Sequence, residues 1–590
     1  MSDLVLLGYS GVHGAAKIKS YFFPGASARE LAFSQGGDSA AAVVVGGRIV
    51  AAAAEERFTG HKHTGEFPRN AIAWCLRNAG AAVDDVHKIA HAFDFSGLGQ
   101  WAERDHYYQR LYTDALSPDA QIKLVAEHFG SSLAQRFCPV RHHDCHAAYA
   151  YHSSGFSSAA VLVSDGLGEA ESASFFRAVD GKLERMGNVA AMHSLGVLYG
   201  LVTHYLGFWF GSDEYKVMGL APYGDPARFR SLFRNYIRLF PSGNYSVPLL
   251  AANTTVEEKQ FYETSISILE HDFGPCRAPD ELIGQQHVDI AAALQECFNE
   301  TLLHVLKRVR TLTGESKICL SGGCAMNCSA NGVAARSGIF QEMYVSPAAG
   351  DDGAAAGAAL MIGASLNHIT PRRMAPPLLG HTLEDCEIEA ALPPSGVRIT
   401  KYQEDDDQLG DISALLANGN IVAWAQGAME FGQRALGARS ILADPRHVEM
   451  RDRINVLVKK REQFRPFAPA VTAEDASRFF EIESGSEIMY DSMLFTTYVS
   501  AQMRSKLPAV THVDGSARVQ TVTERANPLF WKLLHTFGSL TGIPILLNTS
   551  FNVAGQPIVR TATEAVSTFL GTELNAICIG KYLLVKERPS

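Results

Sequence analysis

Short apolar runs separated by glycine turns open the chain. Residues 5–9 (VLLGY) predict a short buried strand, and residues 39–45 and 48–54 predict two more strands. Gly46 and Gly47 join the later pair, and consecutive glycines accept the positive φ angles that a tight hairpin turn needs. The pattern therefore predicts a strand followed by a β-hairpin.

A similar strand-turn-strand unit recurs farther along the chain. Residues 159–164 form an apolar run, residues 165–169 read DGLGE, and residues 172–178 predict the returning strand. Because helical segments follow each unit, the repetition suggests a duplicated α/β domain of the actin and sugar-kinase type. In that architecture the glycine turns face each other across a cleft and hold nucleotide phosphates, although short hairpins also occur in many other folds.

A long helix and a glycine turn are predicted next. Apolar side chains recur every three to four positions over residues 289–310, which is typical of a helix that faces a core. Residues 318–320 predict a strand that runs into Gly322 and Gly323. Paired glycines after a strand let backbone amides approach a phosphate or ribose closely. The same turn can be purely structural, and this one lacks the lysine of a phosphate-binding loop.

The domain organisation follows from length and from a change in composition. The chain has 590 residues, enough for two or more cores. Proline and arginine interrupt it at residues 370–377 (TPRRMAPP), where we expect the boundary between two domains. The predicted domains are residues 1–373 and 374–590.

Composition excludes several classes of protein. With 62 acidic and 52 basic residues the net charge is -10, so there is no global electrostatic footprint for nucleic acid. No apolar run is long and charge-free enough to span a bilayer, and the N-terminus lacks the pattern of an export signal. We therefore expect a cytoplasmic protein without a nucleic-acid or membrane partner. Its ten cysteines contain no CxxC pair and are expected to be reduced.

Three histidines, His142, His143 and His146, lie within five residues. If this segment is helical, His142 and His146 stand at positions i and i+4 on one face, with His143 turned away. Two imidazoles and a carboxylate from a nearby strand end form a plausible divalent-metal site. The adjacent acids Asp351 and Asp352 are candidates for a remaining ligand, because neighbouring carboxylates repel unless solvated or paired with a cation. Histidines that cap a helix or bond within a core would explain the same spacing.

Cations concentrate in the later part of the chain. Residues 427–440 (GAMEFGQRALGARS) and 459–467 (KKREQFRPF) set arginines and lysines beside glycines and aromatics. Because the protein is acidic overall, this local density favours a nucleotide or triphosphate site over a solvated face. Arg518 supplies a further guanidinium. Residues 548–552 (NTSFN) follow an apolar strand at residues 544–547, and ligands commonly bind at such a strand end.

Two polar loops are further candidates for ligand contacts. Residues 61–68 (HKHTGEFP) contain Lys62, which could meet an anion, although a solvated loop explains the same residues. Residues 212–224 (SDEYKVMGLAPYG) have a charged centre between glycine and proline, which suits a surface that orders around a ligand.

Together these motifs resemble one family, the O-carbamoyltransferases that modify nodulation factors and antibiotics. Similar elements occur in the family's order over almost the whole chain: EERF with Lys62, HHDCHA, DGLGE, EYKVMGL, SGG, GDDG, GQRALG, FRPF and LNTSFN. The resemblance implies a duplicated actin-like (Kae1-like) domain at residues 1–373 that transfers a carbamoyl group. It also implies an α/β YrdC-like domain at residues 374–590 that forms carbamoyladenylate.

The resemblance also implies the substrates and the cofactor. Carbamoyl phosphate and ATP, the latter with Mg²⁺, would react in the C-terminal domain and release pyrophosphate and phosphate. The N-terminal domain would hold a divalent metal, expected to be Fe²⁺, and pass the carbamoyl group to a hydroxyl of a small natural-product acceptor. Hydroxyl activation needs a base, for which His143 is a candidate.

The site residues implied by the resemblance are carried over position by position, with Asp352 replacing Asp351 if the register shifts by one. The metal ligands are His142, His146, Asp165 and Asp351; the catalytic residues are His142, His146, Asp165, Arg434, Lys459, Arg518 and Ser550; and the substrate-binding residues are His13, Lys62, Lys216, Gly322, Gly323, Asn327, Arg439, Arg465 and Asn548.

One departure from the family pattern stands out. In the family, Asp-Ser usually follows the first histidine directly, but here His13 is separated from Asp38 and Ser39 by residues 14–37. This insertion could be a lid, a flap that contacts the acceptor, or a disordered surface loop. In each case it interrupts the usual pairing of His13 with Asp38.

Three other functions remain as alternatives. A tRNA-modifying enzyme of the threonylcarbamoyladenosine type would be expected to carry a basic stripe, and this chain is acidic. An actin-like ATPase or kinase would not need a histidine pair with two carboxylates. A noncatalytic binding module is poorly compatible with two separately equipped sites. The sequence names neither the acceptor nor the oligomeric state, for which a homodimer is one option.

Overall fold

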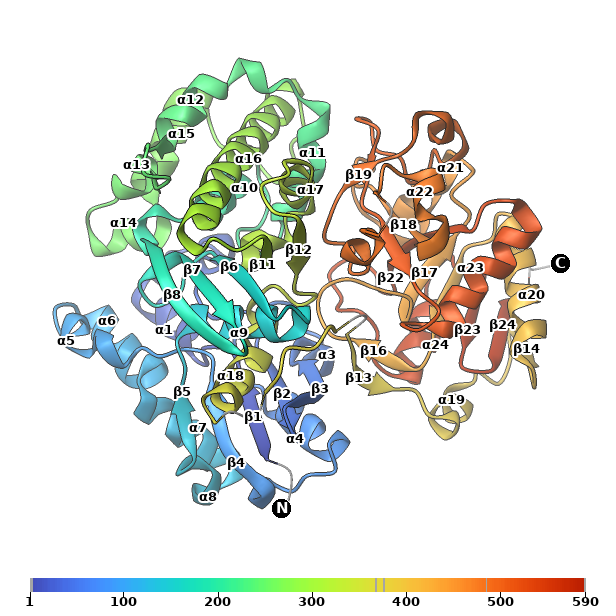
Figure 1. Ribbon diagram of the computed structural model, residues 1–590, viewed down its shortest axis with the longest axis horizontal. Coiled ribbons are helices and arrows are strands. Elements are labelled where there is room, and N and C mark those ends of the chain that lie inside the picture. Colours follow the sequence, from blue (N-terminus) through green and yellow to red (C-terminus); the bar gives the residue numbers. More distant parts are fainter. Residues whose placement is uncertain (1–3, 367–368, 375–376, 484, 588–590) are drawn as a thin grey trace. The chain divides into compact units, whose positions relative to one another are not determined.

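The computed structural model describes residues 4–366, 369–374, 377–483 and 485–587. Contacts within the chain divide it into two compact units, and Figure 1 labels their helices and strands. The first unit contains residues 1–56 and 63–374, and the second contains residues 57–62 and 375–590. Within the predicted boundary region, residues 375–376 lie outside the described residues. No helix in the described parts of the chain is long and apolar enough to cross a membrane.

The first unit contains two five-stranded sheets that share one topology. In one sheet, β1 (Val5–Tyr9) pairs antiparallel with β2 (Ala40–Val45) and parallel with β4 (Val86–His91), in the order β3-β2-β1-β4-β5. In the other, β6 (Ser158–Ser164) takes the place of β1, in the order β8-β7-β6-β11-β12. The predicted duplication of an α/β unit is confirmed by this topology. The remaining strands are β3 (Arg48–Ala54), β5 (Phe137–Pro139), β7 (Glu171–Val179), β8 (Lys182–Ala190), β11 (Lys317–Ser321) and β12 (Glu342–Val345).

The predicted hairpin and long helix are both present. Gly46 and Gly47 join β2 to β3 with φ angles of 54° and 79°, a conformation that glycine adopts without a steric penalty. The helical stripe corresponds to α16 (Gln285–Thr313), which buries Ile290 and Leu294. Both predictions succeeded because the signals lie within a few residues of one another.

The insertion after His13 forms two short helices, α1 (Ala15–Phe22) and α2 (Ala28–Leu31). The side chain of Lys19 is buried, and its Nζ donates to the carbonyl oxygens of Phe33 at 2.6 Å and Gln260 at 3.0 Å. Arg29 donates to the carbonyl oxygen of His204 at 2.7 Å. The insertion is therefore an ordered part of the first unit rather than a disordered loop.

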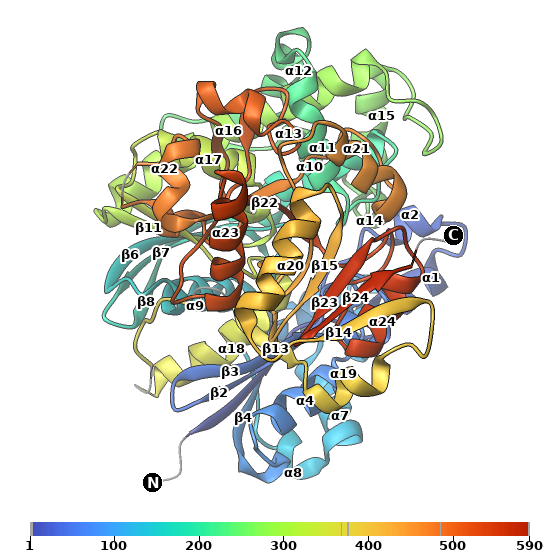
Figure 2. The ribbon, with the colours of Figure 1, turned by 90° about the vertical axis from the view of Figure 1, so that its right-hand side faces the viewer.

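The second unit is built on a mixed eight-stranded sheet in the order β14-β24-β23-β15-β17-β22-β18-β21. Helices α20 (Asp405–Ala417) and α23 (Pro528–Thr541) lie side by side on one face (Figure 2), where Leu416 and Phe530 pack with Trp424 in one core. The strands are β14 (Val397–Lys401), β15 (Val422–Ala425), β17 (Arg439–Ala443), β18 (Ala468–Thr472), β21 (Gln520–Val522), β22 (Ile545–Ser550), β23 (Ala576–Ile579) and β24 (Tyr582–Lys586).

A short segment from early in the chain belongs to the second unit. Residues 57–62 lie within the predicted domain 1–373, but Arg57 donates to the carbonyl oxygen of Gly432 at 3.3 Å. The Arg560 guanidinium lies 4.5 Å from the centre of the Phe58 ring. These contacts join residues that are far apart in sequence. Composition therefore could not reveal that residues 57–62 belong to the second unit.

Candidate metal and anion sites

Four side chains of the first unit converge on one point. His142 and His146 lie near the start of α9 (His142–Ser154), Asp165 follows β6, and Asp351 begins α18 (Asp351–Ser365). Their ligand atoms all lie within 4.8 Å of one another. His142 Nε2 is 3.2 Å from Asp165 Oδ2 and 3.3 Å from Asp351 Oδ1. Two imidazoles and two carboxylates suit a divalent transition metal, and the structure brings Asp351 rather than Asp352 into this group.

The charges of this cluster depend on one another. Burial opposes the charged imidazole of His142, but Asp351 and Asp165 outweigh burial and raise the pKa of His142 well above its usual value. Burial likewise opposes ionisation of Asp165, and the neighbouring histidines, His142 first, lower the pKa of Asp165 instead. The two carboxylates therefore require positive charge between them, which a divalent metal would supply.

Small residues allow α9 and α18 to approach closely enough to form the cluster. A β-carbon at Gly357 would lie 1.8 Å from the carbonyl oxygen of Cys145, and one at Gly353 would lie 2.9 Å from the ring of Tyr149; both partners belong to α9. The two helices pack against each other within the first unit (Figure 1). The small residues of α18 thus determine how near Asp351 lies to the histidines of α9.

The paired-glycine turn after β11 contacts this cluster. The Gly323 amide donates to Asp165 Oδ1 at 2.7 Å. Gly322 has a φ of 88°, and a β-carbon there would lie 2.3 Å from the carbonyl oxygen of Ser164. Because the Gly323 amide is committed to Asp165, this turn positions a candidate metal ligand. The predicted contact of Gly322 and Gly323 with a substrate stays a prediction.

Glu169 is a residue of the site that the sequence analysis did not assign. Its Oε1 accepts hydrogen bonds from the backbone amides of His142 at 2.9 Å and Asp94 at 2.8 Å. It thereby joins the loop that carries Asp165 to the first residue of α9. Its place at the end of the DGLGE turn was visible in the sequence, but its partners were not.

His143 lies outside the ligand group, on the side of α9 that the helical spacing predicts. Its Nδ1 is 2.7 Å from Ser174 Oγ, and the side chain is buried. Burial and the neighbouring positive His142 lower the pKa of His143 to about 3. A general base works best when its pKa lies near the working pH, so this environment disfavours the predicted role of His143.

His13 and Asp38 have separate partners. His13 Nδ1 lies 2.5 Å from Glu66 Oε2, and Asp38 Oδ1 lies 2.8 Å from His63 Nδ1. In this chain His13 thus pairs with Glu66 and Asp38 with His63, and the substrate contact predicted for His13 remains a prediction.

Lys216 and Asn327 make contacts within the protein. Lys216 Nζ lies 3.1 Å from Asp213 Oδ2 and 5.2 Å from the centre of the Phe208 ring. Asn327 is the N-cap of α17 (Cys328–Arg336), where its Oδ1 accepts from the Ala330 amide at 3.0 Å. These contacts give Lys216 and Asn327 a structural role within the protein. The substrate contacts predicted for the two residues stay predictions.

Lys459 is the centre of a cation cluster in the second unit. It ends the helical turn η8 (Ile454–Lys459), and its side chain is buried. Its Nζ donates to the Ser550 carbonyl oxygen and lies 3.2 Å from Ser550 Oγ and 2.8 Å from Asn552 Oδ1. Burial and three nearby cations lower the pKa of Lys459 well below its usual value; in order of effect these are Arg461, Arg465 and Lys62. The structure thus brings together Lys459, Ser550, Arg465 and Lys62.

Arg434 lies on the loop between β16 (Ala428–Glu430) and β17. Within residues 431–440 only Gln433 and Arg434 are partly exposed, and the others are buried. Arg518 is also partly exposed, just before β21. Both residues are therefore partly open to solvent, and their predicted part in catalysis stays a prediction.

Arg439 and Asn548, two predicted substrate contacts, are 0% exposed. The Arg439 guanidinium donates to backbone carbonyl oxygens, including that of Gln426 at 3.0 Å and that of His381 at 2.9 Å. Burial lowers the pKa of Arg439 to about 10. In this structure Arg439 therefore organises the surrounding backbone, and neither side chain is open to a ligand.

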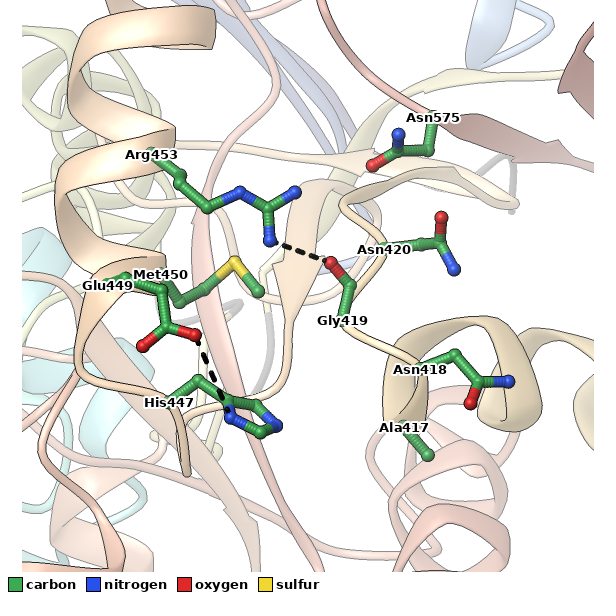
Figure 3. Close-up of a pocket in the computed structure, with 9 residues that line it drawn as sticks. All are labelled: Ala417, Asn418, Gly419, Asn420, His447, Glu449, Met450, Arg453 and Asn575. Carbon is green, nitrogen blue, oxygen red and sulfur yellow. Dashed lines mark hydrogen bonds and ion pairs between the residues drawn. The ribbon is translucent and has the colours of Figure 1, made fainter. Parts of the chain in front are cut away.

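A separate pocket of about 410 Å³ lies on the second unit (Figure 3). Its lining consists of residues 417–420, His447, Glu449, Met450, Arg453 and Asn575. Arg453 donates to the Gly419 carbonyl oxygen at 3.0 Å, and His447 Nδ1 lies 3.9 Å from Glu449 Oε1. Polar groups of the lining thus pair with one another, and none of the predicted site residues is among those that line it.

The described residues thus form one candidate cation site in the first unit and one cation cluster around Lys459 in the second unit. The carbamoyltransferase N-terminus family matches residues 34–360, and the carbamoyltransferase C-terminus family matches residues 413–586. The four candidate metal ligands lie in the first segment, and Lys459 lies in the second. The chain belongs to the carbamoyltransferase family, which confirms the resemblance found in its motifs.

The chain is also similar to two nodulation proteins and to an O-carbamoyltransferase. Nodulation protein NolNO of Sinorhizobium fredii is 39% identical over 540 residues, which cover 91% of this chain and 77% of that protein. Nodulation protein NolO of Bradyrhizobium diazoefficiens is 40% identical, covering 76% of this chain and 79% of that protein. The 3'-hydroxymethylcephem-O-carbamoyltransferase of Amycolatopsis lactamdurans is 34% identical, covering 47% and 50%.

Proposed function

We propose that the protein is an O-carbamoyltransferase that works in two stages. The second unit forms carbamoyladenylate, and the first unit transfers its carbamoyl group to a hydroxyl of a small natural-product acceptor. The observation that carries this proposal is the separation of charge between the units: imidazoles and carboxylates gather in the first, and cations gather around Lys459 in the second. The similarity to a cephem O-carbamoyltransferase supports the reaction class.

The proposed substrates of the second unit are carbamoyl phosphate and ATP with Mg²⁺. Both are polyanions that repel each other, and Arg434, Arg465, Arg518 and Lys62 offset that repulsion. Lys459 is held by Ser550, and burial, followed by the repulsion of nearby cations, lowers its pKa. A bound phosphate would favour the charged form of Lys459, so anion binding and protonation of this amine are coupled.

The first stage has a simple balance of bonds. Water cleaves carbamoyl phosphate into carbamate and phosphate. A carbamate oxygen then attacks the α-phosphorus of ATP, the bond between the α-phosphorus and the bridging oxygen breaks, and pyrophosphate leaves. Positive side chains stabilise the charge that develops on the phosphoryl oxygens.

In the first unit, His142, His146, Asp165 and Asp351 would hold a divalent metal such as Fe²⁺. When bound, this metal would supply Lewis acidity that polarises the carbamoyl carbonyl. The acceptor oxygen attacks the carbamoyl carbon, AMP leaves, and the hydroxyl proton passes to water.

An assay with two readouts tests this proposal. Protein, ATP, carbamoyl phosphate, ferrous iron and candidate alcohols are incubated, and both pyrophosphate and the carbamoylated product are measured. We expect His146→Ala to abolish carbamoyl transfer and to keep pyrophosphate release. His152→Ala is the matched control, because His152 is a buried histidine on α9 outside the ligand group.

Two results would contradict the proposal. Normal transfer by His146→Ala would exclude the metal assignment. Pyrophosphate or phosphate release from ATP that does not depend on carbamoyl phosphate would favour the alternative of a simple ATPase.

A further inference from the structure

Buried side chains that the sequence did not mark hold the loop that carries Arg434. We propose that Gln520 and Asn548 are positioning residues: their amides fix the carbonyl groups of Ala435 and Leu436 and so hold Arg434 in place for an anionic ligand. This inference rests on the proposed function of the second unit. It adds Gln520 to that site and gives Asn548 a role that needs no contact with substrate.

A chain of hydrogen bonds connects the two amides to the loop. Gln520 Nε2 donates to the Leu436 carbonyl oxygen at 2.9 Å. Asn548 Nδ2 donates to the Ala435 carbonyl oxygen at 3.2 Å and to Gln520 Oε1 at 2.8 Å. Gln520 is 3% exposed and Asn548 is 0% exposed, so water cannot replace these donors without a change in structure.

The sheet leaves room for this amide pair. Strand β18 lies between β22 and β21, and the pair crosses it. Asn548 is the cross-strand neighbour of Ala468, and Gln520 is that of Ala470. Ala468 and Ala470 are two residues apart and therefore point to the same face of the sheet. Because they carry only methyl groups, the longer amide side chains can meet above them.

Glu430 holds the other polar groups of the same loop. Its Oε1 accepts from the backbone amides of Leu436 at 2.7 Å, Ala438 at 3.0 Å and Arg439 at 3.1 Å. The loop is therefore fixed through its carbonyls by Gln520 and Asn548 and through its amides by a carboxylate. A backbone held on both sides has few ways to move the residue at its tip, Arg434.

Strand β22 connects the residues that hold the Arg434 loop to the cation cluster around Lys459. Asn548 and Ser550 are two residues apart on β22, so their side chains share a face of the sheet. Asn548 reaches the loop of Arg434, and Ser550 Oγ lies 3.2 Å from Lys459 Nζ. The same strand face thus sets the positions of two cations that the proposed anion site uses.

The competing interpretation is that Gln520 only stabilises the core, and a matched pair of variants separates the two. Gln520→Met removes the donor to Leu436 with little change in shape. Gln408→Met is the control, because Gln408 is also buried in the second unit and donates to one backbone carbonyl, that of Gly580, at 2.9 Å. Both variants should lose thermal stability, and Gln520→Met should lose somewhat more, because it also removes the acceptor for Asn548 Nδ2.

Only Gln520→Met should impair the anion site. We expect its kcat/KM for ATP in carbamoyl-phosphate-dependent pyrophosphate release to fall by about 10-fold to 100-fold, as expected when a contact residue is misplaced. Gln408→Met should stay near the wild-type value. Hydrogen exchange of the amides of residues 432–437 should accelerate in Gln520→Met alone. If Gln520→Met does not fold, Asn548→Leu tests the same bonds.

The outcomes separate this inference from the proposed function. Unchanged exchange in the loop, or faster exchange with unchanged kinetics and ATP affinity, would overturn the positioning role. A wild type that binds ATP but releases no pyrophosphate would overturn the proposed function alone, because ATP affinity and hydrogen exchange still decide the role of Gln520. A wild type that binds no ATP would overturn both.

Discussion

The two candidate sites are built from opposite chemical groups and balance their charges differently. In the first unit, the carboxylates of Asp165 and Asp351 lie against two imidazoles. The carboxylates raise the pKa of His142, and the pKa of each carboxylate is lowered, with His142 the first of the neighbours that lower it. In the second unit, the neighbours that shift the pKa of Lys459 are all cations, and they act against its charge. The candidate metal cluster thus contains groups of both signs, whereas the neighbours that shift the pKa of Lys459 share its sign, and an anionic ligand is what we propose for the second unit. Sites of opposite charge in separate units suit a reaction in which one makes an activated intermediate and the other consumes it.

Lys459→Met tests the cation cluster and should have the largest effect. We expect pyrophosphate release to fall by about 10²-fold to 10³-fold, comparable to the loss of one donor that stabilises developing charge. Thermal stability should change little, because the variant relieves a buried amine that burial and cationic neighbours disfavour but also removes its hydrogen bonds to Ser550 and Asn552.

The neighbouring lysine provides the control for this variant. Lys460 is exposed, so Lys460→Met should keep pyrophosphate release near the wild-type level. Equal losses in the two variants would mean that general positive charge, rather than the buried amine of Lys459, supports the reaction.

Asp351→Asn and Asp352→Asn together test which of these two adjacent aspartates is the metal ligand. Because Asp351 lies 3.3 Å from His142 and Asp352 lies outside the ligand group, Asp351→Asn should lose metal and transfer while Asp352→Asn keeps both. The loss of metal affinity should exceed the ~10-fold to 100-fold loss that follows substitution of residues that only hydrogen-bond to the ligands. Metal content after gel filtration and the absorption spectrum with Co²⁺ measure it. The reverse result would move the ligand to Asp352.

Glu169→Ala should have an intermediate effect on the same cluster. It removes the acceptor for the His142 and Asp94 amides, so metal affinity should fall by about 10-fold to 100-fold while pyrophosphate release is kept. Glu169→Gln retains an oxygen that can accept these bonds and should restore most of the affinity. Failure of glutamine to restore it would show that the negative charge matters more than the hydrogen bonds.

Local patterns in the sequence predicted much of this architecture. The Gly46–Gly47 turn, the stripe of α16 and the i, i+4 spacing of His142 and His146 each depend on residues close in the chain, and the structure contains all three. The convergence of Asp165 and Asp351 on the histidines came from the family resemblance, since nothing in the spacing of these acids fixes their distance.

Features that depend on distant contacts could not be predicted in this way. Residues 57–62 join the second unit through Gly432 and Arg560, which are remote in sequence. Arg439 had the charge expected of a ligand contact. However, the sequence pattern of a basic residue beside glycines is the same whether the side chain faces solvent or donates to backbone carbonyls. Gln520 carries no charge and lies in no motif with an assigned role, so only its hydrogen bonds reveal it.

A second buried lysine sharpens the comparison and should give the smallest effect on activity. Lys19, in the insertion, donates to backbone carbonyls, and burial lowers its pKa to about 7 although Glu30 acts to raise it. The unfolded chain, in which lysine keeps its ordinary pKa, therefore binds more protons between pH 7 and about 10.5. The cost of burying Lys19 is fully present below pH 7 and is relieved as pH rises through that window, by about 1.4 kcal/mol for each unit of pKa difference.

Lys19→Met should remove this gain in the free energy of unfolding, measured with urea at about pH 7 and about pH 9, and should leave pyrophosphate release unchanged. An identical pH dependence in variant and wild type would show that Lys19 stays charged in the folded protein. A loss of pyrophosphate release would give the insertion a part in the chemistry that is proposed for the second unit.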